Sequence, residues 1–260
     1  MKLKNILAEI DEICPFSLQE PWDHSGLQVG DGEAEIHKIL MAFDYTEAIL
    51  AEAVAGEYDL IICHHPFFFQ PTYDIDLQTA KGRMIAGLIK NDIALIACHT
   101  NLDKIGGFGV NAVLGDTLGL TACRTFMAEE SGVGFGMFGT LPAPLTFGDF
   151  ARQVKERLRL QSVRTVGNID DKVRTVAVMG GSGFDFMADA LNQGADVYVS
   201  SDFKYHDGQR AAEIGMKLID CSHFGTEVPV VEVFAQKLRE ILTDTEIVIA
   251  GEIKDYWQYR

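Results

Sequence analysis

The chain has 260 residues, of which 47% are hydrophobic and 23% are charged, and its formal net charge is −16. This composition is typical of a folded globular protein and excludes a disordered chain. The acidic balance disfavours a general nucleic-acid binder, which neutralises phosphates with a basic surface. A nucleotide substrate stays open, because bound divalent cations would reverse the sign of the charge locally.

The sequence gives no sign of a targeting or membrane segment. Its longest apolar runs fall short of the ~20 residues that a membrane-spanning helix needs. A first helix is expected over Met1–Ile10, and its acidic residues exclude a signal peptide. Five cysteines without a C-x-x-C pair disfavour a disulfide framework or a thiolate zinc finger. We therefore expect a protein of the reducing cytoplasm.

The first part of the chain alternates strands with helices. Thr46 is placed to cap a helix whose apolar face would be Ile49, Leu50 and Val54. Such alternation favours a mostly parallel sheet with helices packed on it. After a turn-rich stretch and a short strand at Pro21–Gly30, the expected strands are Lys38–Phe43, Asp59–Cys63 and Ile93–Cys98, and the expected helices are Glu47–Ala55, Gln78–Lys90 and Val110–Leu118.

The second part repeats this pattern after a glycine-rich connector of about residues 123–170. Pro142 and Pro144 are expected to break the chain there, and Thr146 to start a helix. The strands expected next are Val173–Met179, Ala195–Ser200, Lys217–Cys221 and Glu246–Ala250, with helices over Phe184–Gln193, Gly208–Ile214 and Val230–Leu242. We therefore predict an α/β fold of two similar domains, residues 1–125 and 126–260, with segment 230–260 as a candidate addition to the first.

Polar clusters follow three of the predicted strands. His64 and His65 come directly after one, and His99 and Asp103 follow the next. His223 and Glu227 follow a strand of the second domain at a spacing of i, i+4, which fits one face of a first helical turn or a tight loop. Ligands of α/β proteins bind beyond the carboxyl ends of strands. The three clusters therefore predict a metal site between the two domains.

The residue types narrow the choice of metal. Neighbouring His64 and His65 point opposite ways in an extended segment, so two ions could each take one. Imidazoles with carboxylates suit Zn, Mn, Fe, Co or Ni better than Mg or Ca. A lone histidine at a strand end is usually structural, and the metal hypothesis depends on the three clusters together. Three cysteines that could also bind a metal are interpreted as buried hydrophobic residues: Cys63, Cys98 and Cys221. His37 is interpreted as a surface residue.

Three other features leave two interpretations open. The Gly180–Gly183 turn, with Gly181 and Ser182 as candidate substrate-binding residues, is either a phosphate cradle or a tight turn. Lys204 and His206 either orient the substrate and shuttle protons or belong to a solvated loop. Phe67–Phe69 is read as core or subunit interface and not as a base-stacking platform.

Together these segments resemble the NIF-three-like family of dinuclear metal-centre proteins, often labelled GTP cyclohydrolase I type 2 homologues. The resemblance implies two metals held by His64, His65, Asp103, His223 and Glu227, with Glu227 bridging them and His99 close by. It also implies two similar α/β domains and a ring-shaped homohexamer with its metal sites facing an internal cavity. The segments that carry it are Trp22–Gly30, Asp59–Phe69, His99–Asp103, Gly180–Gly183, Ser201–Asp207 and His223–Glu227.

Two departures from the family pattern stand out. His24 occupies a position where the pattern usually has Asn, which leaves open whether this histidine approaches the metals. The chain also lacks the insert that longer members carry between the halves.

The function predicted from sequence is a dinuclear metal-dependent hydrolase acting on a nucleotide-like or phosphorylated small molecule. Two divalent ions would lower the pKa of a water, and His99 or His206 would relay protons. The alternative is a non-catalytic metal-binding, metal-delivery or regulatory protein. The acidic composition disfavours nucleic acid as a partner, and no membrane partner is expected.

Overall fold

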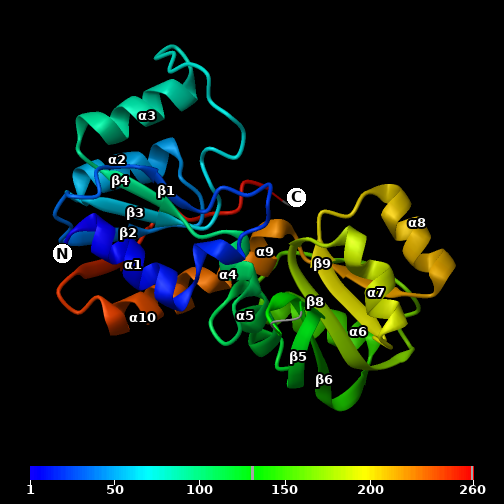
Figure 1. The fold of residues 1–260 in the computed structure, drawn as a ribbon. Coiled ribbons are helices and arrows are strands. Elements are labelled where there is room, and N and C mark those ends of the chain that lie inside the picture. Colours follow the sequence, from blue (N-terminus) through cyan, green and yellow to red (C-terminus); the bar gives the residue numbers. More distant parts are fainter. Residues whose placement is uncertain (130–131, 259) are drawn as a thin grey trace. The chain divides into compact units, whose positions relative to one another are not determined.

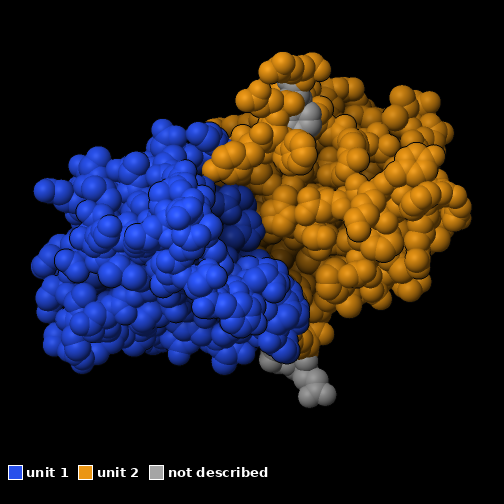
Figure 2. Space-filling model, turned by 90° about the horizontal axis from the view of Figure 1, so that it is seen from above, with its two compact units in different colours: residues 1–102, 231–254 blue, residues 103–230, 255–260 orange. Residues whose placement is uncertain are grey.

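The computed structural model describes residues 1–129, 132–258 and 260 (Figure 1). The chain forms two compact units, which Figure 2 distinguishes by colour. Unit 1 consists of Met1–Leu102 and Val231–Lys254, and unit 2 of Asp103–Val230 and Asp255–Arg260. The sequence pattern suggested domains of 1–125 and 126–260, and that assignment of domains stays a prediction.

Unit 1 is built on a five-stranded sheet in the order β1-β4-β3-β2-β11. Strands β4, β3, β2 and β11 are parallel, and β1 pairs with β4 in the antiparallel direction. Figure 1 shows α2 and α3 on one face of this sheet and α1 and α10 on the other. The elements are α1 (Leu3–Ile13), η1 (Phe16–Leu18), β1 (Gly26–Val29), β2 (Lys38–Met41), α2 (Glu47–Ala55), β3 (Leu60–Cys63), α3 (Ala80–Lys90), β4 (Ala94–Ala97), α10 (Pro229–Ile241) and β11 (Glu246–Ile249).

The two central strands of unit 1 are buried on both faces. Every residue of β3 and of β4 is buried, as expected of a parallel strand covered by helices on each side. Both strands end abruptly, and the polar residues beyond them lie at the same edge of the sheet because the strands run in parallel. This arrangement brings the residues that follow Cys63 and Ala97 together.

Helix α2 begins where the sequence predicts. Thr46 caps it, with its side-chain oxygen accepting a hydrogen bond from Ile49 N at 3.2 Å. Ile49 is buried as expected, but Val54 is 41% exposed, so its assignment to the apolar face is wrong. Ala53, which is fully buried, takes that place against the sheet.

Unit 2 is built on a six-stranded mixed sheet in the order β5-β6-β8-β9-β10-β7. Strands β8, β9 and β10 are parallel, while β5, β6 and β7 pair in the antiparallel direction. The elements are α5 (Val110–Thr117), β5 (Thr121–Ala128), β6 (Gly134–Thr146), α6 (Phe147–Arg157), β7 (Arg164–Val166), β8 (Lys172–Ser182), η2 (Phe184–Phe186), α7 (Met187–Asn192), β9 (Val197–Ser201), α8 (Tyr205–Ile214), β10 (Lys217–Asp220) and α9 (His223–Glu227). Helix α4 (Thr100–Lys104) joins the two units.

Alternate residues of the central strands face two separate cores in unit 2. Val176 and Val178 of β8 pack in the core that contains α5 and α6. Ala177 and Met179 pack in the core that contains α7 and α8. The sheet is therefore covered on both faces, and the predicted fold class of two α/β units is confirmed.

Several predicted boundaries in unit 2 are wrong. Pro142 and Pro144 do not break the chain, because β6 continues through them to Thr146. The residues Gly180–Ser182 are the end of strand β8, and no α-helix opens there; a short 3-10 helix at Phe184–Phe186 precedes α7. Helix α8 begins at Tyr205, three residues before the predicted Gly208, and therefore includes His206.

Among residues 1–129, 132–258 and 260, none of the helices combines the length and the apolar character that crossing a membrane requires.

Candidate metal centre

Unit 1 brings three histidines together at the edge of its sheet. His64 and His65 follow β3 and His99 follows β4, and each offers a ring nitrogen within 4.8 Å of the others. Their ring centroids are 4.8 to 5.4 Å apart. His64 is buried, whereas His65 and His99 are partly exposed. We call these residues the three-histidine cluster.

Each ring of the three-histidine cluster is held through its Nδ1 atom. His64 Nδ1 lies 2.8 Å from the carbonyl oxygen of Cys98, which can only accept a hydrogen bond. His65 Nδ1 lies 2.7 Å from Asp44 Oδ1, and His99 Nδ1 lies 2.8 Å from Asp23 Oδ1. Since these acceptors keep the proton on Nδ1, the lone pair of a neutral ring is on Nε2. The rings are thus oriented as histidines that bind a cation through Nε2.

Asp23 is the most strongly held of these acceptors. Its side chain is fully buried and accepts hydrogen bonds of 2.6 to 3.1 Å from His24 N, Ser25 Oγ, His99 Nδ1 and both the N and Oγ1 of Thr100. Burial alone would raise the pKa of Asp23, but the hydrogen bonds from His99 and Thr100 hold it well below its usual range. Asp23 is therefore a carboxylate at neutral pH.

Aromatic rings surround the three-histidine cluster. Phe43 stacks on His64 at a centroid distance of 5.8 Å. Trp22 and Phe69 contact each other edge-on at 5.8 Å, and they meet the His99 ring at 6.0 and 6.3 Å. Trp22 is 54% exposed and Phe69 is 45% exposed. The cluster is thus bounded by one buried aromatic ring and by two exposed ones.

Unit 2 contains a second group, Asp103, His223 and Glu227, which we call the carboxylate cluster. His223 and Glu227 lie one turn apart on α9, and His223 Nε2 is 2.9 Å from Glu227 Oε2. Carboxylate oxygens of Asp103 and Glu227 lie within 4.8 Å of each other. Of the two arrangements left open by the sequence, a helical turn and a tight loop, the structure has the helical turn.

The His223 ring is oriented in the same way as the rings of unit 1. Its Nδ1 atom lies 2.7 Å from Asp202 Oδ2. Burial lowers the pKa of His223, but its hydrogen bonds to Asp202 and Glu227, together with their charges, raise it to about 10. Without a metal ion the ring is an imidazolium at neutral pH, so a cation that binds Nε2 displaces a proton.

Glycines allow the backbone of β8 to approach Glu227 closely. Gly181 has φ of +66°, and a Cβ atom there would lie 2.3 Å from Glu227 Oε1. Its N–H donates to Thr226 Oγ1 at 3.0 Å, and the N–H of Gly180 donates to Asn111 Oδ1 at 2.9 Å. These two N–H groups are therefore engaged within unit 2. The substrate-binding roles of Gly181 and Ser182 stay predictions.

The other residues singled out in the sequence lie elsewhere. Lys204 and His206 are exposed at the start of α8, where His206 Nδ1 is 3.2 Å from Gln209 Oε1, and their functional roles stay predictions. His37 is exposed, as expected. The three cysteines that precede the clusters are buried, and burial raises the pKa of each thiol: Cys63, Cys98 and Cys221.

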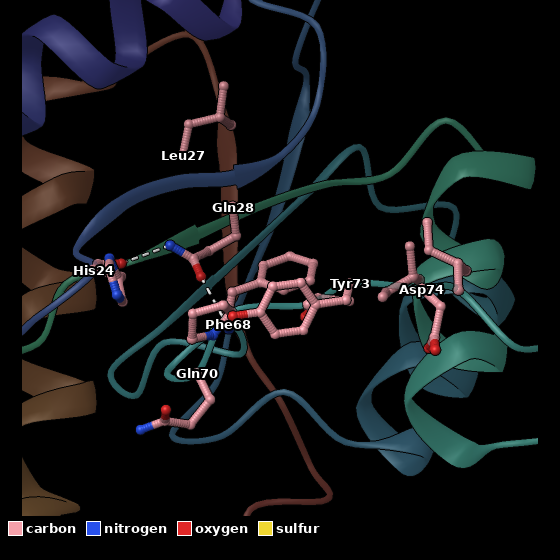
Figure 3. A pocket seen from close by; sticks show the side chains of 11 residues that line it. His24, Leu27, Gln28, Phe68, Gln70, Tyr73 and Asp74 are labelled. Carbon is pink, nitrogen blue, oxygen red and sulfur yellow. Dashed lines mark hydrogen bonds between the residues drawn. The ribbon is translucent and has the colours of Figure 1, made fainter.

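The expectation for Phe67–Phe69 is confirmed in part. Phe67 packs on the core of unit 1. Phe68 instead lines a surface cleft together with His24 (Figure 3), and Phe69 meets His99.

Sequence reasoning missed the carboxylates that hold the histidines, Asp23, Asp44 and Asp202. Asp44 carried a detectable signal, because it follows the end of a predicted strand as His64 does. Asp202 carried the same signal, because it lies two residues beyond the predicted strand Ala195–Ser200, whereas Asp23 stands in a turn-rich segment without it. The acceptor roles of Asp23 and Asp202 depend on tertiary contacts with residues 76 and 21 positions away.

Comparisons with known proteins agree with this fold. Residues 1–255 match the family model of DUF34/NIF3 (NGG1p interacting factor 3). A "GTP cyclohydrolase 1 type 2 homolog" of Clostridium perfringens is 36% identical over 264 residues, which cover all of both chains, and one of Clostridium acetobutylicum is 33% identical over 267 residues, covering 100% of this chain and 99% of the relative.

Solved structures give the same result. A Staphylococcus aureus protein is 29% identical with a TM-score of 0.94, covering 100% of this chain and 99% of the other. Reduced HcgD from Methanocaldococcus jannaschii is 28% identical with a TM-score of 0.83, covering 96% of this chain and 98% of the other. A Bacillus cereus protein related to NIF3, at 24% identity and a TM-score of 0.95, has the same fold over 100% of this chain and 99% of its own.

Proposed function

Since the chain belongs to the DUF34/NIF3 family, we propose that it is a metal-dependent hydrolase that acts on a nucleotide-like or phosphorylated small molecule. The observation that supports this most directly is the three-histidine cluster, in which every Nδ1 atom is engaged and each ring offers a nitrogen within 4.8 Å of the others. Histidines held in this way are typical of metal ligands.

We propose a pair of divalent ions as the cofactor. The donors, imidazole nitrogens and carboxylate oxygens without a thiolate, fit Zn, Mn, Fe, Co or Ni. Among the described residues, no cysteine sulfur belongs to these groups of candidate ligands, which supports the absence of sulfur from the ligand set. The proposed ligands are His64, His65, Asp103, His223 and Glu227.

The bound ions and the side chains near them would have different roles in the reaction. Divalent ions, when bound, supply Lewis acidity and lower the pKa of water. Asp23 holds the His99 ring with Nδ1 engaged, so His99 can accept or donate a proton at Nε2. Trp22 and Phe69 meet the His99 ring and limit its exposure to water. His206 is the alternative proton relay.

The substrate class is taken from the relatives. Proteins named "GTP cyclohydrolase 1 type 2 homolog" are 36% and 33% identical to this chain over its whole length. Hydrolytic opening of a purine ring in a nucleotide is therefore the first reaction to test. We further propose action as a homohexamer in the cytoplasm, for which the five free cysteines are suitable.

The test combines metal content with turnover. The purified chain is analysed for metals, loaded with each candidate ion, and assayed against GTP, other nucleotides and phosphodiesters. His64→Ala and Glu227→Ala should abolish turnover, while His37→Ala, which changes an exposed histidine, should not.

Two outcomes would overturn the proposal. Tight, exchangeable metal binding without turnover on the whole panel would favour a metal-delivery or regulatory protein. Turnover that persists in both His64→Ala and Glu227→Ala would place the activity elsewhere in the chain. Metal content measured on each single variant would further show whether the two clusters hold the same ions. An ion that both clusters hold would be lost in His64→Ala and also in Glu227→Ala.

A further inference from the structure

A cleft of about 690 Å³ lies in unit 1 between residues 24–28, which run into strand β1, and the loop that follows the double histidine (Figure 3). Its volume falls within the range of small-molecule sites. Its lining combines aromatic and aliphatic side chains with a few polar ones, including Phe68, Tyr73, Leu27, His24 and Gln70. Such a mixture is typical of a pocket that binds a small molecule with an apolar body and polar edges.

One side chain fixes the two walls of the cleft. Gln28 Nε2 donates to the carbonyl oxygen of His24 at 2.6 Å, and Gln28 Oε1 accepts from Phe68 N at 3.2 Å. Figure 3 shows both hydrogen bonds, with Gln28 between the two segments. Both ends of the Gln28 amide are thus engaged by the backbone, and the cleft is formed before anything binds.

Side chains of the cleft are exposed in a way that folding alone does not explain. Tyr73 is 93% exposed, and Ile75 and Leu27 are 53% and 41% exposed. His24 is also exposed, and no side-chain hydrogen bond of its ring is found among the described residues. Exposed apolar groups gathered around a hollow mark an interaction site.

The charges of the lining indicate which part of a ligand fits. Among the described residues that line the cleft there is no lysine or arginine, and Asp74 is an acid. The ammonium of Lys81 lies over the Phe68 ring, 5.3 Å from its centroid, but Lys81 does not belong to the lining. The lining itself therefore offers no basic partner to a phosphate group. Tyr73 offers an exposed π face, Phe68 contributes an aromatic wall with Lys81 over its ring, and His24 and Gln70 offer hydrogen bonds. This combination can bind a planar heteroaromatic ring.

The cleft and the surroundings of the three-histidine cluster share two segments of the chain. Trp22 and Phe69 meet the His99 ring, while His24 and Phe68, one or two residues away in each segment, line the cleft. The same two segments therefore contribute to both.

We propose that this cleft binds the planar heteroaromatic ring of the substrate, with Tyr73 stacking on its face, Phe68 lining the wall and His24 hydrogen-bonding to its edge. The proposal rests on the proposed hydrolase, for which the cleft supplies the recognition of the base.

Direct binding tests the proposal without turnover. Guanosine is titrated into the full-length chain by calorimetry, and D-ribose serves as the probe without a ring. Tyr73→Ala and His24→Ala should each weaken guanosine binding about tenfold, the effect of losing one stacking or hydrogen-bonding partner. Tyr205→Ala, which removes an 83% exposed tyrosine of unit 2, and His37→Ala are the matched controls and should leave binding unchanged.

Two results would overturn the ring site. Equal guanosine affinity in Tyr73→Ala and Tyr205→Ala would exclude a role for the cleft, as would binding of D-ribose as tight as that of guanosine. A change of oligomeric state in Tyr73→Ala with unchanged guanosine affinity would instead make this surface an interface between copies of the chain.

The two proposals fail separately. If guanosine binds as predicted but no nucleotide is turned over, the hydrolase is wrong and the ring site stands. If nucleotides are turned over and KM is unchanged in Tyr73→Ala and His24→Ala, the ring site is wrong and the hydrolase stands.

Discussion

The carboxylate of Asp23 and the imidazole of His99 lie 2.8 Å apart, although the two residues are separated by 76 positions in the chain. Thr100, the residue after His99, donates to Asp23 through both its N–H and its hydroxyl. Asp23 thus binds the ring and the backbone that carries it. This double attachment fixes the direction in which His99 Nε2 points.

Replacing Asp23 with Ala should lower the free energy of unfolding by about 3 kcal/mol or more at pH 7, because a buried, hydrogen-bonded charge is removed from its partners. The pKa of Asp23 lies below its ordinary 3.8 in the folded chain. Its stabilising contribution is therefore complete above that pH and is lost as the pH falls further. Urea unfolding of wild type and Asp23→Ala between pH 7 and pH 3 measures this. A difference between them that stays constant down to pH 3 would contradict the assignment.

Asp202 and Asp44 should tune metal affinity through the histidines that they hold. An Asn at either position can turn its NH₂ toward the imidazole and so favour the tautomer whose Nε2 is protonated and cannot bind a cation. Asp202→Asn and Asp44→Asn should weaken metal binding by about 10- to 100-fold, measured by competition with a chelating dye.

Asp202 also has φ of +61°, a conformation that Asn tolerates as well as Asp, so backbone strain does not confound that variant. Asp185→Asn, at an exposed carboxylate of unit 2, is the control. An equal loss of affinity in the control would show that net charge, and not orientation, is responsible.

Gly181→Ala should disturb Glu227 specifically. Both Gly181 and Gly194 have positive φ, so an Ala at either costs about 1–2 kcal/mol in unfolding free energy. Only at Gly181 would the added Cβ meet Glu227, whereas nothing lies within 4 Å of a Cβ at Gly194. Gly181→Ala should therefore lose more stability than Gly194→Ala and should also lose metal. If both variants keep the same metal content, the close approach to Glu227 has no role in binding.

Alkylation should separate one cysteine from the other four. Cys123 is exposed, and the buried thiols are Cys14, Cys63, Cys98 and Cys221. Partial burial, together with the nearby charge of Asp116, raises the pKa of Cys123, so its reaction with iodoacetamide should be slow at pH 7 and faster at higher pH.

Intact mass of the native chain should show one modification, and urea-unfolded chain should show five. Native modification of Cys63 or Cys98 would mean that these thiols are accessible beside the three-histidine cluster.

Regular elements with a single dominant signal could be predicted from the sequence. The apolar runs of β3 and β4 predicted the two strands. The histidines that follow these runs predicted the edge of the sheet at which the candidate ligands lie. Thr46 gave the start of α2. The prediction that Val54 belongs to the buried face of α2 was wrong. The buried face of a helix depends on how its side chains fit the sheet, and the fully buried Ala53 packs there in place of the larger and more apolar Val54.

Irregular strands could not be predicted. Pro142 and Pro144 lie within β6 because its register with β8 shifts between Thr140 and Leu145, so the prolines stand where the ladder is interrupted. The start of α8 was missed for a different reason: Asp207 Oδ2 accepts from Lys204 N at 2.7 Å, and this local cap, which was overlooked, allows the helix to begin before Gly208. The register shift of β6, in contrast, forms only once β6 and β8 have paired.

Strand β11 pairs with β2, so the edge of the first sheet is completed by residues that follow the whole of the second unit's central segment. During translation residues 103–230 are synthesised before β11. The sheet of unit 1 therefore keeps one unpaired edge, at β2, until β11 has been synthesised. Unit 2 can begin to fold before that. That interval is when the chain is most exposed to mispairing with another copy, and when a chaperone would protect it best.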